Sequence, residues 1–131
     1  MSDKLDVVGI GNAMVDAIIP SNQSEIEKHE INRDSMNLID ENLKNNLHES
    51  YSIREMAGGG SLGNSMFGIT SFGGNGSFIG KIKNDEIGVY LQKDMMREGL
   101  KFPLGFTSPD ISTGCCTIFV EEDGTRTMCT F

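Results

Sequence analysis

The sequence lacks the features that would place it in a membrane or secreted class of protein. No apolar run approaches the roughly 20 residues that a membrane-spanning helix needs. The longest candidate, 7–20, is interrupted by glycine, asparagine and aspartate. The N-terminal segment 1–6 carries two acidic residues and none of the apolar stretch that a signal peptide requires. We therefore expect a cytoplasmic protein.

Basic residues and cysteines are also scarce. Lys and Arg number 11 against 19 Asp and Glu, which gives a net charge of −8, and no basic cluster occurs. Because such a chain repels nucleic-acid backbones and acidic membrane surfaces, we expect neither as a partner. The three cysteines, Cys115, Cys116 and Cys129, contain no Cys-x-x-Cys pair. This pattern indicates neither a disulfide framework nor a metal site, so packed, reduced thiols are expected.

Short apolar strands alternate with helices along the 131 residues, a length typical of one globular domain. Ser24 to Glu27 fits a capping box, and Asp40 and Asp85 can each cap a further helix. Asp123-Gly124 is a strong hairpin signal. Strands are expected over 6–10, 14–19, 77–82, 113–120 and 125–131, and helices from Ser24, from Asp40, over 64–72 and from Asp85 to Gly99. The alternation favours an α/β sheet with an appended hairpin.

The first candidate motif is Gly9-x-Gly11-Asn12-x-x-x-Asp16, directly after a strand expected to be buried. It lacks the third glycine of a dinucleotide-binding fingerprint. Asn12 and Asp16 are four residues apart and would share one face of a strand. An amide and a carboxylate on one face suit a polyhydroxyl ligand. A turn asparagine and a surface aspartate remain the alternative.

The second motif is the glycine-rich stretch from Ala57 to Ser65, where Asn64 is expected to open a helix. It is not a phosphate-binding Walker loop, because no Gly-Lys-Ser/Thr follows. Consecutive glycines let the backbone approach a ligand closely, and the start of a helix favours oxygen ligands. A flexible loop is the alternative.

The remaining candidates are less specific. The segment 80–88 is explained by a strand, a turn and a capped helix. Arg126 follows the expected hairpin turn and either contacts an anion or is an exposed strand charge. His29 and His48 have no partners at metal-ligand spacing and are assigned to solvent.

Taken in order, three segments resemble the PfkB/ribokinase family of carbohydrate kinases, and most nearly its adenosine kinase branch. They are Gly9-x-Gly11-Asn12-x-x-x-Asp16, Gly59-Gly60-Ser61-x-x-Asn64 and Gly80-Lys81-x-x-x-Asp85-x-x-Gly88. The resemblance runs from about residue 6 to residue 131. It implies that 1–131 is the N-terminal, substrate-binding portion of a kinase domain. The implied fold is a partial Rossmann-like ribokinase fold of the α/β class. A small β-sheet lid would come from about 14–19, 30–40 and 113–131.

The resemblance also implies an activity. The family transfers the γ-phosphoryl group of ATP, with Mg²⁺, to a hydroxyl of a sugar or nucleoside. Nothing in 1–131 resembles the Gly-Ala-Gly-Asp motif that supplies the family's general base. We therefore expect that aspartate beyond Phe131, and the ATP and Mg²⁺ sites largely outside this chain. The implied substrate-binding residues are Asn12, Asp16, Gly59, Gly60 and Asn64, and the implied phosphoryl contact is Arg126.

Adenosine, phosphorylated on a ribosyl hydroxyl, is the favoured substrate, because the Gly-x-Gly-Asn and Gly-Gly-Ser-x-x-Asn-Ser forms are usual in that branch. A PfkB sugar kinase acting on ribose, fructose or a similar sugar is the alternative. A catalytically inactive ligand-binding module, or an interaction module that forms a homodimer through the lid, is a further alternative. The 131-residue chain alone is expected to be inactive as a kinase.

Overall fold

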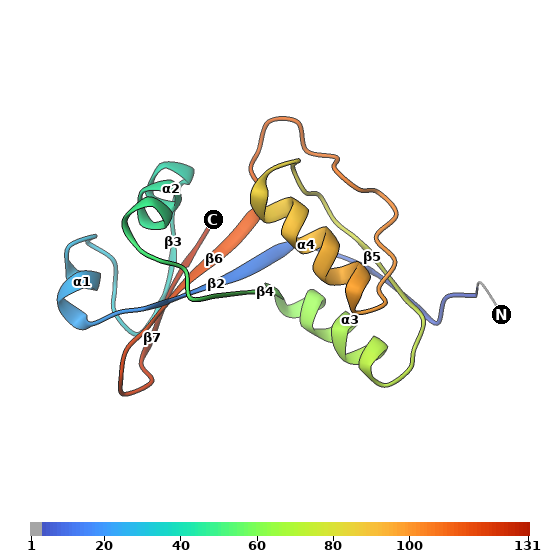
Figure 1. The fold of residues 1–131 in the computed structure, drawn as a ribbon, viewed down its shortest axis with the longest axis horizontal. Coiled ribbons are helices and arrows are strands. Elements are labelled where there is room, and N and C mark those ends of the chain that lie inside the picture. Colours follow the sequence, from blue (N-terminus) through green and yellow to red (C-terminus); the bar gives the residue numbers. More distant parts are fainter. Residues whose placement is uncertain (1–3) are drawn as a thin grey trace. The chain divides into compact units, whose positions relative to one another are not determined.

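A computed structural model describes residues 4–131, in which strands and helices alternate along the chain (Figure 1). The first residues of the N-terminal segment considered above, 1–3, lie outside the described residues. Within 4–131 no helix has the length and apolar character needed to cross a membrane. The chain divides into two compact units: unit 1 is Met1–Val15 with Ala57–Gly114, and unit 2 is Asp16–Met56 with Cys115–Phe131.

Unit 1 is built on a pair of parallel strands. β1 (Val7–Ile10) pairs with β5 (Gly76–Ile79), and α3 (Ser61–Ser71) packs against both strands. The second helix of the unit is α4 (Glu86–Arg97). The fully buried side chains that form its core include Met66, Phe78, Ile82, Leu91 and Met95.

The burial expected for β1 is only partly right. The strand forms as predicted, and Gly9 is buried against Met66 of α3. Val8 and Ile10, which point to the other face, are 49% and 76% exposed. The reason is that α3 covers only the glycine side of the strand.

A five-stranded sheet has the order β3-β7-β6-β2-β4. Its pairings include the predicted hairpin, in which β6 and β7 are antiparallel, and a parallel pairing of β3 with β7. The expected lid segments 14–19, 30–40 and 113–131 supply four of these strands. The bounds are β2 Met14–Pro20, β3 Met36–Leu38, β4 Glu55–Gly59, β6 Gly114–Val120 and β7 Arg126–Thr130.

One face of the unit 2 part of this sheet is closed by two helices, α1 (Gln23–Glu27) and α2 (Glu41–Ser50). The buried cluster joins Ile19, Phe119 and Cys129 of the strands to Ile26 and Leu47 of the helices. The cysteines are free and buried, as predicted. Burial raises the pKa of Cys115 to about 12 and that of Cys129 to about 11, so both are protonated at neutral pH.

Two helix caps were predicted correctly. Asp40 accepts a hydrogen bond from the Leu43 N–H at 2.8 Å, and Asp85 accepts one from the Gly88 N–H at 2.8 Å. Because an N-cap depends only on residues a few positions apart, the sequence is enough to predict it.

Two helix starts were predicted wrongly. The cap of α1 is Asn22, whose side chain accepts from the Glu25 N–H at 3.1 Å, while the Ser24 hydroxyl donates to the same Asn22 oxygen. The helix α3 begins at Ser61 rather than Asn64, since Gly60, with φ +78°, turns the chain into the helix without a side-chain cap.

Asp85 has a larger structural role than an ordinary cap. Its carboxylate also accepts from the Thr113 N–H at 2.9 Å and from the Thr113 hydroxyl at 2.7 Å. Thr113 is 1% exposed and directly precedes β6. One carboxylate therefore joins the start of α4 to a segment 28 residues away.

We predict that Asp85→Ala destabilises the chain more than Asp40→Ala. Losing the Asp40 cap should cost about 1 kcal/mol. Losing Asp85 should cost about 3 kcal/mol, because a buried Thr113 N–H is left without its partner as well. Urea unfolding of the two variants beside the wild-type chain measures both values. Equal losses would contradict the role given to Thr113.

Candidate functional site

Four of the predicted site residues, Asn12, Gly59, Gly60 and Asn64, belong to unit 1. Asn12 is exposed in the link between β1 and β2. A Cβ built on Gly60 would lie 3.6 Å from the Asn12 carbonyl oxygen. The Asn64 N–H donates to the Gly60 carbonyl at 2.9 Å, and the Asn64 side chain is exposed. Gly60 thus lies near the backbone of both asparagines.

The glycine-rich stretch is not the flexible loop that was the alternative interpretation. Gly58 and Gly59 form the end of β4, and Gly60 is the residue before α3. The first turn of an α-helix has N–H groups without partners in the helix, which favours oxygen atoms of a ligand there. The end of β4 and the start of α3 together hold the backbone of the glycine stretch close to Asn12 in a fixed conformation.

Asp16 belongs to unit 2 and lies on β2. Asn12 precedes that strand, so the expectation that both side chains share one strand face is wrong. Along β2, Val15, Ala17 and Ile19 are buried, whereas Asp16 is intermediate. Because strand side chains alternate, Asp16 points away from the face that α1 and α2 close. Burial of about half of the group raises the pKa of the Asp16 carboxyl.

The face that carries Asp16 is otherwise mostly apolar; we call it the open face. Cys116 lies opposite Thr130, Ile118 opposite Met128, and Val120 opposite Arg126. These residues alternate with Phe119 and Cys129, which are buried on the helix side. Burial is the main cause that raises the pKa of the Cys116 thiol, and the negative charge of Asp16 adds to it. The open face consists of Asp16, Ile18, Cys116, Ile118, Val120, Arg126, Met128 and Thr130, with Met36 and Leu38 of β3 beside them.

The open face was not predicted from the sequence, although its signal is present there. Met36 is 56% exposed and Leu38 is 80% exposed. Both alternate with the polar residue Asn37, and the strand register places them beside Met128 and Thr130. An apolar face with one carboxylate can hold a ligand that has a flat apolar part and hydroxyl groups.

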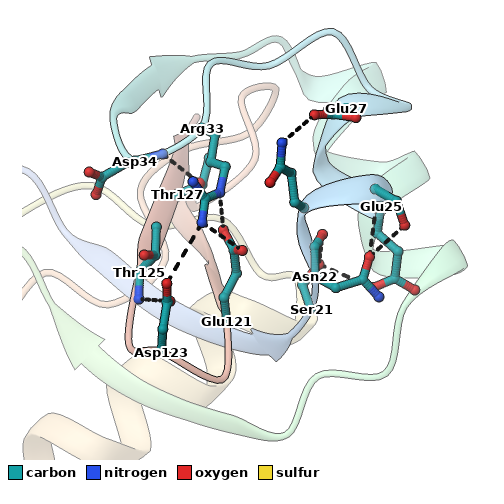
Figure 2. A network of polar contacts seen from close by, with 12 residues as sticks. Ser21, Asn22, Glu25, Glu27, Arg33, Asp34, Glu121, Asp123, Thr125 and Thr127 are labelled. Atoms are coloured by element: carbon teal, nitrogen blue, oxygen red, sulfur yellow. Dashed lines mark hydrogen bonds and ion pairs between the residues drawn. The ribbon is translucent and has the colours of Figure 1, made fainter.

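Arg126 is exposed at the start of β7. Figure 2 shows the polar contacts that hold the β6–β7 hairpin, to which Arg126 belongs. Arg33 donates from Nε to Glu121 Oε1 at 2.7 Å and from Nη2 to Oε2 at 3.0 Å, and it lies 3.8 Å from Asp123. The Glu121 carboxylate raises the pKa of Arg33. The Asp34 N–H donates to Thr127 Oγ1 at 2.9 Å. The hairpin that carries Arg126 is therefore fixed on both sides of the turn.

The assignment of both histidines to solvent is wrong. His29 Nε2 lies 2.8 Å from the Tyr51 hydroxyl, and His48 Nε2 lies 2.8 Å from Thr117 Oγ1. Each contact joins residues far apart in the sequence, so no local pattern indicates it.

No group of three His, Cys, Asp or Glu in the part of the chain that the structure describes is arranged to hold a metal ion. We therefore assign no metal ligand to these residues.

Comparison with known proteins defines the class to which this fold and these residues belong. A model of the pfkB family carbohydrate kinases matches residues 4–131, and the chain belongs to this family. No match is found among curated proteins. The family predicted from the three ordered motifs is confirmed.

Solved structures agree on the fold. The chain is similar to the adenosine kinase from Sinorhizobium meliloti, with 35% identity and a TM-score of 0.83 over 98% of this chain and 39% of that one. It is also similar to a probable sugar kinase from Rhizobium etli, with 32% identity and a TM-score of 0.79 over 97% of this chain and 38% of that one. The Anopheles gambiae adenosine kinase, at 23% identity, has the same fold, with a TM-score of 0.80 over 95% of this chain and 38% of that chain. The predicted α/β ribokinase-like fold is confirmed, and the chain spans about 39% of the length of the Sinorhizobium meliloti kinase.

We predict that Asp16→Asn raises the melting temperature at pH 7. A carboxyl whose pKa is higher in the folded chain than in the unfolded chain holds its proton longer when folded. Stability is therefore lost as the pH rises from the ordinary value of 3.8 through the raised pKa. Asparagine carries no charge and so lacks the cost of burying a carboxylate. The increase in melting temperature should therefore shrink as the pH falls toward 3.8.

Thermal melts from pH 3 to pH 8 test this expectation. Asp110→Asn, at an exposed loop residue, is the matched control and should leave the melting temperature unchanged. An Asp16→Asn variant that melts below the wild type at pH 7 would show that the carboxylate stabilises the fold instead.

Proposed function

We propose that this chain forms the substrate-binding part of an ATP-dependent kinase that phosphorylates a ribosyl hydroxyl, with adenosine as the substrate. The observation that carries the proposal is the half-buried carboxylate of Asp16 on the apolar open face. Membership of the pfkB family supports the reaction class. The similarity to the Sinorhizobium meliloti adenosine kinase supports the substrate.

The composition of the open face favours a nucleoside over a free sugar. A carboxylate accepts hydrogen bonds from two neighbouring ribose hydroxyls. Ile118, Met128 and Leu38 offer an apolar surface on which a flat base can pack. A free sugar carries hydroxyls around its ring, and an apolar face would leave several of them without partners.

The other site residues have supporting roles in this proposal. Asn12 and Asn64 donate to and accept from ribose oxygens, and Gly59 and Gly60 let the backbone come close to the sugar. Arg126 contacts the transferred phosphoryl group. Phosphoryl transfer depends on positioning and charge stabilisation. This chain's contribution is to bind the acceptor hydroxyl and orient it. Membership of the family implies ATP and Mg²⁺, and we propose that their sites lie largely outside this chain.

A sugar kinase is the second candidate. It is favoured by the similarity to the probable sugar kinase from Rhizobium etli, which is nearly as high as that to the adenosine kinase. Asp16 would have the same role with either substrate. The two candidates differ only in whether a base packs on the apolar part of the open face. They are therefore separated by comparing a ligand that has a base with one that lacks it.

Calorimetric titration of the chain with adenosine and with ribose tests the proposal. Adenosine should give a saturable heat, and ribose at the same concentration should not. Asp16→Asn should weaken adenosine binding at least tenfold, because a neutral amide loses the charge-assisted hydrogen bonds to the hydroxyls. The matched control, Asp110→Asn, changes an exposed acid that is not part of the open face and should leave the affinity unchanged.

The outcomes are distinct. Binding of ribose as strongly as adenosine would favour the sugar kinase. Heat with neither ligand would contradict the proposal, as would an Asp16→Asn variant that binds adenosine as the wild type does.

A homodimer through the lid stays a prediction, supported by the exposed Met36 and Leu38 on β3, an outer strand of the five-stranded sheet. Sedimentation velocity should show dimers at rising concentration, and Leu38→Lys should give monomers. A wild-type chain that stays monomeric at high concentration would remove the prediction.

A further inference from the structure

A buried carboxylate on α4 has no role in the site described above. Asp94 is 6% exposed as a residue, although it lies in a helix whose outer side faces solvent. Burying a charged group costs free energy unless partners compensate for the lost hydration. The partners of Asp94 therefore indicate why a carboxylate lies there.

The two oxygens of Asp94 have different partners. Oδ1 forms an ion pair with Arg97, which is three residues away on the same helix and has a side chain 67% exposed. Because the Arg97 side chain is largely exposed, water screens this pair and we expect its contribution to be small. Oδ2 accepts from the Gly58 N–H at 2.9 Å, across 36 residues of sequence. A hydrogen bond from a backbone N–H to a charged carboxylate is among the stronger kinds, so the contact with Gly58 is the one to explain.

Gly58 lies on an outer strand of the five-stranded sheet. It belongs to β4, the last strand in the order β3-β7-β6-β2-β4, so one side of this strand has no strand partner among the described residues. Asp94 supplies a hydrogen-bond acceptor for its N–H. A Cβ on Gly58 would lie 2.7 Å from the Phe67 ring and 3.0 Å from Asp94 Oδ2. Side chains from α3 and α4 thus meet at one backbone position that admits no side chain.

The next two residues are the ones assigned to the ligand. Gly59 is buried, and Gly60 has φ +78° and lies against the Asn12 carbonyl. The carbonyl of Gly60 accepts from the Asn64 N–H at 2.9 Å. A shift of Gly58 would therefore be carried directly to Gly60 and from there to Asn64.

We propose that Asp94 is a positioning residue, which holds Gly58 through its N–H and so fixes the Gly59–Gly60 segment and the start of α3 for ligand binding. All the contacts that carry this inference lie within unit 1. The expected effect on ligand binding rests on the proposed function. The effect of Asp94 on the backbone position does not rest on that function, and it can be measured without any ligand.

Backbone amide hydrogen exchange, followed by NMR, directly tests the hydrogen bond between the Gly58 N–H and Asp94. In Asp94→Ala the Gly58 N–H should exchange at least tenfold faster than in the wild-type chain, and the Gly60 N–H should exchange faster as well. Asp94→Asn keeps an oxygen that can accept from Gly58 and should restore slow exchange. The matched control is Arg97→Ala, which removes the ion pair alone and should leave both rates unchanged.

Adenosine titration of the same variants tests the consequence. Affinity should fall about tenfold in Asp94→Ala, return in Asp94→Asn and stay at the wild-type value in Arg97→Ala. If Asp94→Ala does not fold, Asp94→Asn must still exchange at the wild-type rate for the proposal to hold. Fast Gly58 exchange in Arg97→Ala, or unchanged exchange in a folded Asp94→Ala, would overturn it.

Failure of the proposed function looks different. A wild-type chain that binds no adenosine, but whose Gly58 exchange follows the predicted order of the variants, would disprove the substrate and support Asp94 as the residue that positions the segment. Reduced affinity in Asp94→Ala with unchanged Gly58 exchange would overturn the positioning role while leaving the substrate in place.

Discussion

Hydrogen bonds from carboxylates of α4 to distant backbone N–H groups are the interaction on which the rest of unit 1 depends. Asp85, at the start of the helix, accepts from Thr113, and Asp94, near its end, accepts from Gly58. Both partners lie next to positions where the chain passes between the two units, at Met56–Ala57 and Gly114–Cys115. One helix therefore contacts the chain at two distant points of unit 1.

Unit 2 follows a different physical rule, the alternation of side chains along a strand. One set of side chains, with Ile19, Phe119 and Cys129, closes a core with α1 and α2. The other set forms the open face, where Asp16 is the one acidic residue among mostly apolar neighbours. Partial burial raises the pKa of that carboxyl, which is a cost to the free chain. In our account, the hydroxyl groups of a bound ligand compensate for this cost.

Much of the fold could be predicted because its signals are local. The caps at Asp40 and Asp85 and the turn at Asp123-Gly124 need only a few adjacent residues, and the three ordered motifs were enough to identify the family. The start of α3 was misplaced because a glycine run fits a loop, a strand end or a helix start equally well. For the site, the sequence supplied the residues but not their surroundings. Contacts such as Asp94 with Gly58, or His48 with Thr117, join residues that no short pattern connects.

The central claim is that the face carrying Asp16 binds a nucleoside. A titration of the isotope-labelled chain with adenosine, followed by NMR chemical shifts, tests it most directly. The account predicts saturable shifts at Asp16, Cys116 and Met128 of the open face and at Gly60 and Asn64 of unit 1. Shifts confined to residues outside the open face, or the absence of any shift, would contradict it.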